Sequence, residues 1–121
     1  MRIATIRVRS DTDQALREMR EQFLTARQTG NYQGEVFEFE SPAALFRLLT
    51  PKRWELLETL QSAGACGVRE LARLLERDVR RVHDDISTLL ESGMVERTDD
   101  GKLVVPFAEI HADFVLRGRA A

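Results

Sequence analysis

Arginine side chains are concentrated in one short part of this chain, between residues 69 and 81. The planar guanidinium group donates several hydrogen bonds in a fixed fork, so it binds phosphates and the edge of a guanine base. Aspartates lie among these arginines, and a carboxylate can accept a hydrogen bond from a cytosine amino group. The chemistry indicated by this segment is recognition of nucleic acid. Its arginines are Arg69, Arg73, Arg77, Arg80 and Arg81.

Residues that usually carry catalysis or bind metals are sparse. The single cysteine, Cys66, and the two histidines, His83 and His111, do not form a metal-binding pattern. There is no glycine-rich nucleotide loop and no spacing that suggests a nucleophile beside a base. We therefore expect no enzyme activity, no cofactor and no metal. Cys66 is expected to fill a junction between helices, and His83 is expected to be a partly buried structural residue.

Two short amphipathic helices are predicted to carry the arginines. Apolar residues of 68–75 recur on one helix face and leave Arg69 and Arg73 on the other. Asp78 is a suitable N-cap for a second helix, which ends at Gly93. The apolar face of this second helix is formed by Val79, Val82, Ile86, Leu89 and Leu90. Its opposite face is centred on Arg80, Arg81, Asp84 and Thr88, with Ser87 and Asp85 at the edges.

A β-hairpin is predicted directly after these helices. Asp100-Gly101 is suited to a type I′ turn, and Arg97 and Lys102 flank the tip. Two helices followed by a hairpin form a winged helix-turn-helix, in which the second helix, about 79–91, enters the major groove. The wing, 95–105, then reaches the backbone or the minor groove. The predicted DNA-binding residues are Arg69, Arg77, Arg80, Arg81, Asp84, Ser87, Thr88, Arg97 and Lys102.

A second interpretation of the same arginines stays open. Arg80 with Asp84 and Arg81 with Asp85 are four residues apart, so each pair can form an exposed ion pair of about 0.2–0.5 kcal/mol. Cations in the first turn oppose the helix dipole at a cost of about 0.3–1 kcal/mol, so helix stability explains them poorly. We favour DNA contact, with the aspartates holding the arginines and repelling a misplaced phosphate.

The first 40 residues are expected to form a strand-helix-strand extension. Alternating side chains predict strands over 3–9 and 35–40, the second with its glutamates in water. Between them, 11–27 has the periodicity of a helix with a narrow apolar face. The apolar residues of that helix are Leu16, Met19, Phe23 and Ala26. We expect residues 1–40 to be the dimerisation part of the protein.

Residues 41–116 are expected to form the winged helix-turn-helix domain, followed by a tail at 117–121. The dipeptides at 41–42 and 50–51 each place a proline after a Ser or Thr N-cap, which predicts two helix starts. Alternation over 110–116 predicts a last strand of the same domain. The expected fold class is therefore α+β, mainly helical.

Composition limits the class of protein further. The chain has 121 residues and a net charge of −2, which excludes a general polycation and requires any nucleic-acid binding to depend on local basic residues. No apolar run approaches the roughly 20 residues that span a membrane, and the N-terminus has no signal-peptide core. One cysteine fits a reducing compartment, so we expect a cytoplasmic protein without membrane contact.

Several segments resemble a family of small prokaryotic MarR-like winged-helix transcriptional regulators, some of which are described as antitoxin-like. They are Ser41–Leu57, Val68–Ala72, Arg77–Val79, Val82–Ile86 and Val104–Phe107. The resemblance implies sequence-specific binding of double-stranded DNA as a homodimer, control of the protein's own operon, and a toxin-like protein partner. The competing interpretation is a winged helix that binds proteins through the acidic strand 35–40 or the N-terminal helix.

Overall fold

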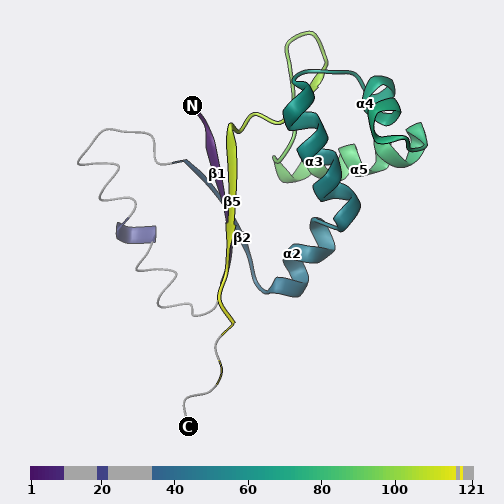
Figure 1. The fold of residues 1–121 in the computed structure, drawn as a ribbon. Helices are drawn as coiled ribbons and strands as arrows, with labels where there is room; N and C mark the ends of the chain where they lie inside the picture. The colour runs from purple at the N-terminus through teal and green to yellow at the C-terminus, as the bar shows by residue number, and fades with distance from the viewer. Residues whose placement is uncertain (10–18, 22–33, 117, 119–121) are drawn as a thin grey trace. The chain divides into compact units, whose positions relative to one another are not determined.

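The computed structural model describes residues 1–9, 19–21, 34–116 and 118, and the protein has an α+β fold. The elements follow one another along the chain as shown in Figure 1. They are β1 (Ile3–Val8), β2 (Glu35–Phe39), α2 (Pro42–Leu48), α3 (Pro51–Ala63), α4 (Val68–Leu75), α5 (Val79–Ser92), β3 (Glu96–Arg97), β4 (Leu103–Val104) and β5 (Glu109–Asp113).

The chain divides into two compact units. The first consists of Met1–Leu45 with Glu109–Ala121, and the second of Phe46–Ala108. In the first unit the strands lie in the order β2-β1-β5, and both pairings are parallel (Figure 1). Ile6 of β1 lies opposite Phe37 on one side and Ala112 on the other. The central strand therefore has its backbone groups paired along both edges, as a buried strand requires.

Strand β5 differs from the expected arrangement. The sequence assigned 110–116 to the helical domain, but the strand spans Glu109–Asp113 and belongs to the first unit through its pairing with β1. Alternation of side chains indicates a strand without specifying its partner. Here β1 provides the partner, because its Ala4 and Ile6 side chains are buried and its second edge needs hydrogen bonds.

The strands predicted near the N-terminus are confirmed as β1 and β2. Glu38 and Glu40 are exposed, as expected, whereas Glu35 lies on the other face of β2 and forms a 2.6 Å ion pair with Arg2. The helix predicted over 11–27 falls mostly outside the described residues. Residues 19–21 of it are helical, and Met19 is exposed rather than buried.

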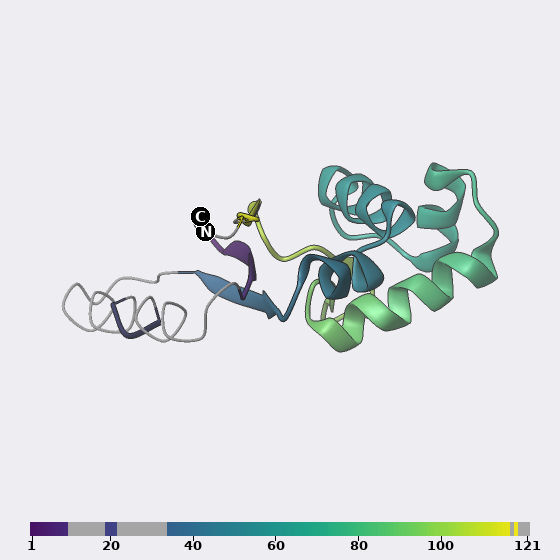
Figure 2. The same ribbon diagram turned by 90° about the horizontal axis from the view of Figure 1, so that it is seen from below.

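The second unit is built from α3, α4 and α5 with the β3-β4 hairpin. Thr50 caps α3 by accepting a hydrogen bond from the backbone N–H of Arg53, and Pro51 is the first helical residue. The helix α4 packs against both α3 and α5, and α3 also contacts β4. Figure 2 shows α3 and α4 on the same side of α5. The core of this unit includes Leu49, Leu56, Leu57, Leu60, Leu71, Val82, Ile86, Leu89, Met94 and Leu103.

The turn between α4 and α5 holds Glu76 in the left-handed conformation, with φ 54°. Its backbone N–H donates to the Arg73 carbonyl at 3.1 Å, and the N–H of Arg77 donates to the Ala72 carbonyl at 3.0 Å. Asp78 then caps α5 by accepting a hydrogen bond from the Arg81 N–H, as the sequence predicted. This short turn fixes the direction in which α5 leaves α4, although glutamate is a strained choice at its left-handed position.

The hairpin has a different turn from the expected type I′. Thr98 and Lys102 close a three-residue loop through a 2.8 Å bond from the Thr98 N–H to the Lys102 carbonyl. Within this loop only Gly101 has a positive φ, of 82°, whereas a type I′ turn requires it at Asp100 as well. The Gly101 N–H donates to the Thr98 carbonyl, which gives a type I turn followed by a left-handed glycine.

None of the helices in the described part of the chain is both long enough and apolar enough to cross a membrane.

Candidate nucleic-acid interface

The outward face of α5, defined here as Arg80, Arg81, Asp84, Ser87 and Thr88, is the candidate interface. Arg80 and Arg81 lie in the first turn of the helix and are exposed, and Asp84 has 77% of its side chain exposed. Among the described residues, neither arginine side chain has a hydrogen bond or an ion pair. Two unpaired guanidinium groups are therefore presented to the solvent at the start of α5.

The hydroxyl groups on this face are turned toward the helix itself. Ser87 Oγ donates to the His83 carbonyl at 3.1 Å, and Thr88 Oγ1 donates to the Asp84 carbonyl at 3.4 Å. Ser87 is exposed and Thr88 is half-buried. In this arrangement both residues offer an incoming ligand an acceptor oxygen rather than a free O–H donor.

The Arg81–Asp85 ion pair of the second interpretation does not form among the described residues, because Asp85 binds two other arginines. Its Oδ1 lies 3.0 Å from Arg53 Nε, and its Oδ2 lies 2.8 Å from Arg77 Nη2. The side chains of Arg53, Asp85 and Arg77 are 20%, 15% and 14% exposed. We call these three residues the Asp85 triad. It connects the start of α3, the α4–α5 turn and the middle of α5.

The triad also includes Arg77, which the sequence placed among the predicted DNA contacts. Its side chain is mostly buried and paired with Asp85. Arg53 Nη1 also donates a 2.8 Å hydrogen bond to the Leu48 carbonyl, which fixes the position of this guanidinium. Both guanidinium groups thus hold α5 in place and are not presented on its outward face.

Two other predictions for α5 are wrong. His83 is not partly buried, because 59% of its side chain is exposed, and its Nδ1 lies 4.0 Å from Asp84 Oδ1. Val79, expected on the inward face, is 37% exposed, since it is the first residue of α5 and the buried residues of this helix begin only at Val82. The inward face is otherwise confirmed by the burial of Val82, Ile86 and Leu89.

The remaining predicted contacts lie on α4 and on the hairpin. Arg69 is exposed on α4, and Arg97 and Lys102 are exposed at the hairpin. Arg97 Nη1 donates to the Gly101 carbonyl at 3.2 Å, which holds this guanidinium beside the tip. At the tip, the hydroxyl of Thr98 donates to the Asp100 carboxylate and lowers the pKa of that carboxyl. Asp99 and Asp100 balance the charge of the two hairpin cations.

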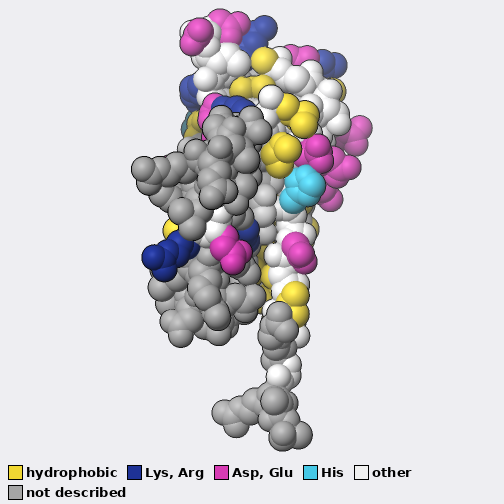
Figure 3. All heavy atoms as spheres, turned by 90° about the vertical axis from the view of Figure 1, so that its left-hand side faces the viewer, with side chains coloured by type: hydrophobic (Ala, Val, Ile, Leu, Met, Phe, Trp, Pro, Cys, Tyr) yellow, Lys and Arg dark blue, Asp and Glu magenta, His cyan; other side chains and the backbone are white. Residues whose placement is uncertain are grey.

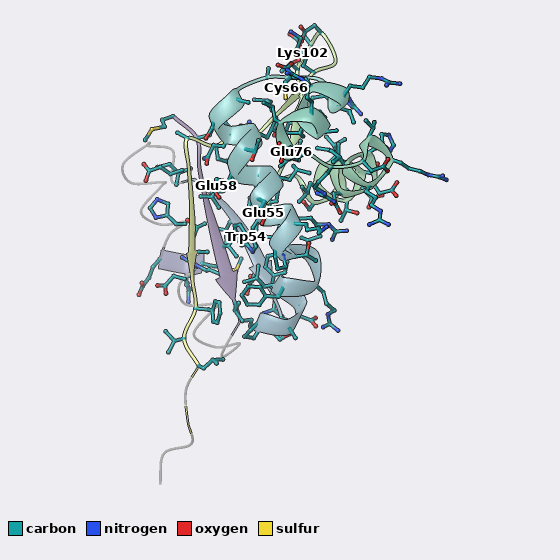
Figure 4. The ribbon with its side chains drawn as sticks, turned by 45° about the vertical axis from the view of Figure 1, so that its right-hand side comes forward. Trp54, Glu55, Glu58, Cys66, Glu76 and Lys102 are labelled. Carbon is teal, nitrogen blue, oxygen red and sulfur yellow. The ribbon has the colours of Figure 1, made fainter. Side chains whose placement is uncertain are left out.

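Cys66 lies at the base of the hairpin, close to Lys102 (Figure 4). Its backbone exchanges two hydrogen bonds with Leu103, of 3.0 and 2.8 Å, and the side chain is buried. Burial raises the pKa of the Cys66 thiol, Glu70 raises it further, and Lys102 opposes both effects. The thiol is therefore protonated at neutral pH. No group of three or more metal-binding side chains occurs in the described part of the chain.

Sequence reasoning missed Lys52 and Arg53 as part of this region. They occupy the first turn of α3, where cations oppose the helix dipole, and α3 has no acidic residue there to offset them. The same signal singled out Arg80 and Arg81 at the start of α5. Applied to α3, it would have identified a second basic helix start.

The first unit has a different surface chemistry. Acidic side chains lie beside a histidine on the face seen in Figure 3. His111 Nε2 and Glu109 Oε1 are 3.0 Å apart, and both residues are exposed on β5. Glu38 and Glu40 are exposed at the end of β2. The unpaired cations described above belong to the second unit instead.

Comparison with known proteins finds one family. The HVO_A0114 family model matches residues 48–112, which extend from the end of α2 to β5. No curated protein and no solved structure matches the chain significantly.

Proposed function

The chain belongs to the HVO_A0114 family, and we propose that the matched part is a winged helix-turn-helix domain that binds double-stranded DNA in a sequence-specific manner. In this proposal α4 and α5 are the helix-turn-helix, α5 is the recognition helix, and the β3-β4 hairpin is the wing. The protein acts as a transcriptional regulator of the MarR-like type and represses its own operon.

The observation that carries the proposal is the pair of unpaired arginines in the first turn of α5. The N-terminal residues of a recognition helix are those that meet base edges in the major groove. Two guanidinium groups there oppose the helix dipole, and neither forms an ion pair with a carboxylate of the described residues. Binding to guanine edges and phosphates gives these side chains a role that helix stability does not.

The hairpin supports the same orientation. Arg97 and Lys102 are exposed on either side of its tip, and Arg97 donates a hydrogen bond to the Gly101 carbonyl. A duplex lying along the outward face of α5 brings its sugar-phosphate backbone toward such a hairpin. Asp99 and Asp100 limit the attraction, so the hairpin positions the protein without providing strong nonspecific affinity.

A dimer follows from the small reach of one such domain. One recognition helix reads only a few base pairs, and two-fold symmetric proteins read two half-sites about one helical turn apart. We propose that the first unit provides the contacts of a homodimer in the cytoplasm, with a toxin-like protein as a further partner. Light scattering at micromolar concentration, with and without DNA, tests this part: a monomeric mass in both conditions contradicts it.

Footprinting on the DNA upstream of the protein's own gene tests the main proposal. We expect protection of two half-sites separated by about one helical turn, roughly 10 base pairs. Binding should weaken steeply with salt, because Lys and Arg contacts to phosphate release counterions. Protection that is uniform along the upstream DNA, and no stronger than that of a random duplex at the same protein concentration, would refute sequence-specific binding.

The alternative is a winged helix that binds a protein. It is favoured by one observation on β2, where Val36 is 44% exposed beside the exposed Glu38. An apolar interface with an acidic margin would bind its partner with little dependence on salt, unlike a phosphate-binding surface. Salt dependence therefore separates the two functions.

A further inference from the structure

We infer that an open pocket between the first turn of α3 and the first half of α5 holds one phosphate group of the DNA backbone. This inference rests on the proposed DNA binding and names the chemical group that this part of the surface takes. The pocket has a volume of about 590 Å³ and lies entirely within the second unit. Its charged lining residues are Lys52, Arg53, Arg77, Arg81, Asp84 and Asp85.

The charge of the lining favours an anion. Four of these side chains are cationic and two are anionic, so the lining has a net charge of +2, whereas the whole chain has a net charge of −2. The positive charge is thus local to this pocket. Such a concentration in a concave surface raises the local concentration of anionic ligands.

The Asp85 triad contributes a positive charge that the protein leaves uncompensated. Two guanidinium groups share a single carboxylate, and all three side chains are at least 80% buried. Arg77 Nη1 is buried and has no hydrogen-bond acceptor in the described part of the chain. Burying an excess charge is unfavourable, and an anion in the pocket beside the triad offsets it. This feature points to an anionic ligand independently of the exposed cations.

Lys52 and Arg81 supply the direct contacts. Both are exposed, and neither side chain has a partner among the described residues. They extend from different helices, α3 and α5, toward the same pocket. A phosphate between them also faces the positive end of the α3 helix dipole, which adds to the attraction. The contact would join α3 and α5 to the DNA backbone at one point.

The position of the pocket indicates the source of the phosphate. Asp84, whose carboxylate is exposed, lines the pocket together with Arg81. Arg81 and Asp84 also belong to the outward face of α5, so DNA on that face brings its backbone to the pocket. We therefore assign the phosphate to DNA and not to a free anion.

Lys52→Gln tests the inference, with Arg47→Gln as the matched control. Arg47 is an exposed cation of the same unit that does not line the pocket. Affinity for a short random-sequence duplex is measured across salt concentrations. Loss of one phosphate contact should reduce the slope of log affinity against log salt by about 0.9 in Lys52→Gln, with little change in Arg47→Gln. Lys52→Arg should restore the wild-type slope, and thermal melts should show that all variants are folded.

Three outcomes overturn the inference. Equal slopes for Lys52→Gln and Arg47→Gln, with wild-type binding intact, reject the pocket but leave the proposed function standing. Absence of salt-dependent binding by the wild-type protein rejects the proposed function together with the pocket. In a second arm, inorganic phosphate is titrated without DNA at constant ionic strength. Saturable chemical-shift changes of the Lys52 and Arg81 backbone amides in NMR spectra would show that free phosphate binds. If the slope of log DNA affinity against log salt is also unchanged in Lys52→Gln, the pocket is a free-anion site instead.

Discussion

Asp85 Oδ2 lies 2.8 Å from Arg77 Nη2, while the other oxygen of the same carboxylate lies 3.0 Å from Arg53 Nε. One acidic side chain of α5 therefore pairs with two arginines, which come from the start of α3 and from the α4–α5 turn. The triad retains one positive charge. Its members have unequal importance for stability, because removing the carboxylate leaves two charges facing each other and removing one arginine leaves a neutral pair.

Asp85→Asn is expected to destabilise the protein by about 3 kcal/mol, since it leaves two mostly buried guanidinium groups without a counter-charge. Arg77→Met is expected to cost clearly less, because Arg53 and Asp85 still pair and the methionine fills the same space. Urea unfolding of the two variants measures both values. An Arg77→Met variant that is as destabilised as Asp85→Asn contradicts this account of the triad.

Arg80→Ala and Arg81→Ala are each expected to weaken selective binding to the upstream DNA by about 1–3 kcal/mol while the fold is retained, because each removes a guanidinium that can contact a base. Arg81→Ala should also lower affinity for a random duplex, because the same side chain contacts the phosphate in the proposed pocket. The measurement is a competition between the upstream fragment and a random duplex, with Arg47→Ala as the control for loss of one positive charge. Unchanged selectivity in both variants would mean that α5 does not read the bases.

Asp84→Asn is expected to raise the total affinity for DNA, unlike the two arginine substitutions. Removing an exposed carboxylate from the outward face of α5 raises affinity for any duplex, because it removes repulsion of phosphate. Discrimination should fall at the same time, since a misplaced backbone is no longer repelled. Binding constants for random and upstream DNA, measured at one salt concentration, check this. A variant with lower affinity for both would show that Asp84 makes an attractive contact instead.

Glu76→Gly is expected to stabilise the α4–α5 turn by about 1 kcal/mol, because a left-handed conformation is strained for a residue with a side chain. Glu76 lies at the turn, as labelled in Figure 4, and is exposed. The midpoint of thermal unfolding measures the gain. Glu76→Ala is the matched control, which removes the same carboxylate but keeps the strain. An equal gain in both variants would attribute the effect to charge and not to backbone conformation.

Cys66 is expected to make stability fall at alkaline pH. Its folded pKa is raised by burial, so its contribution is complete below the ordinary pKa of a thiol and is lost as pH rises toward the folded value. Urea unfolding of the wild-type protein and of Cys66→Ala, compared at neutral and alkaline pH, isolates this contribution. The difference between them should decrease as pH rises. A constant difference would show that the thiol does not titrate differently in the folded state.

Local patterns in the sequence predicted the helices of the second unit well. The spans of α4 and α5, the N-caps Thr50 and Asp78, and the buried face of α5 apart from Val79 agree with expectation. These features depend on interactions between residues at most a few positions apart. Side-chain periodicity and capping therefore specify them directly.

The partners of strands and charged side chains were decided by the tertiary structure. Alternation at 110–116 indicated a strand, but its pairing with β1, more than 100 residues earlier, depends on which edge is free in space. Asp85 has an arginine four residues away, yet it binds Arg53, at a separation of 32 residues, and Arg77. Burial strengthens these contacts, whereas an exposed pair along the helix gains little. The sequence by itself thus determined the local elements and the basic character of α5. Only the three-dimensional packing decided which arginines are used to hold α5 and which are left unpaired on its surface.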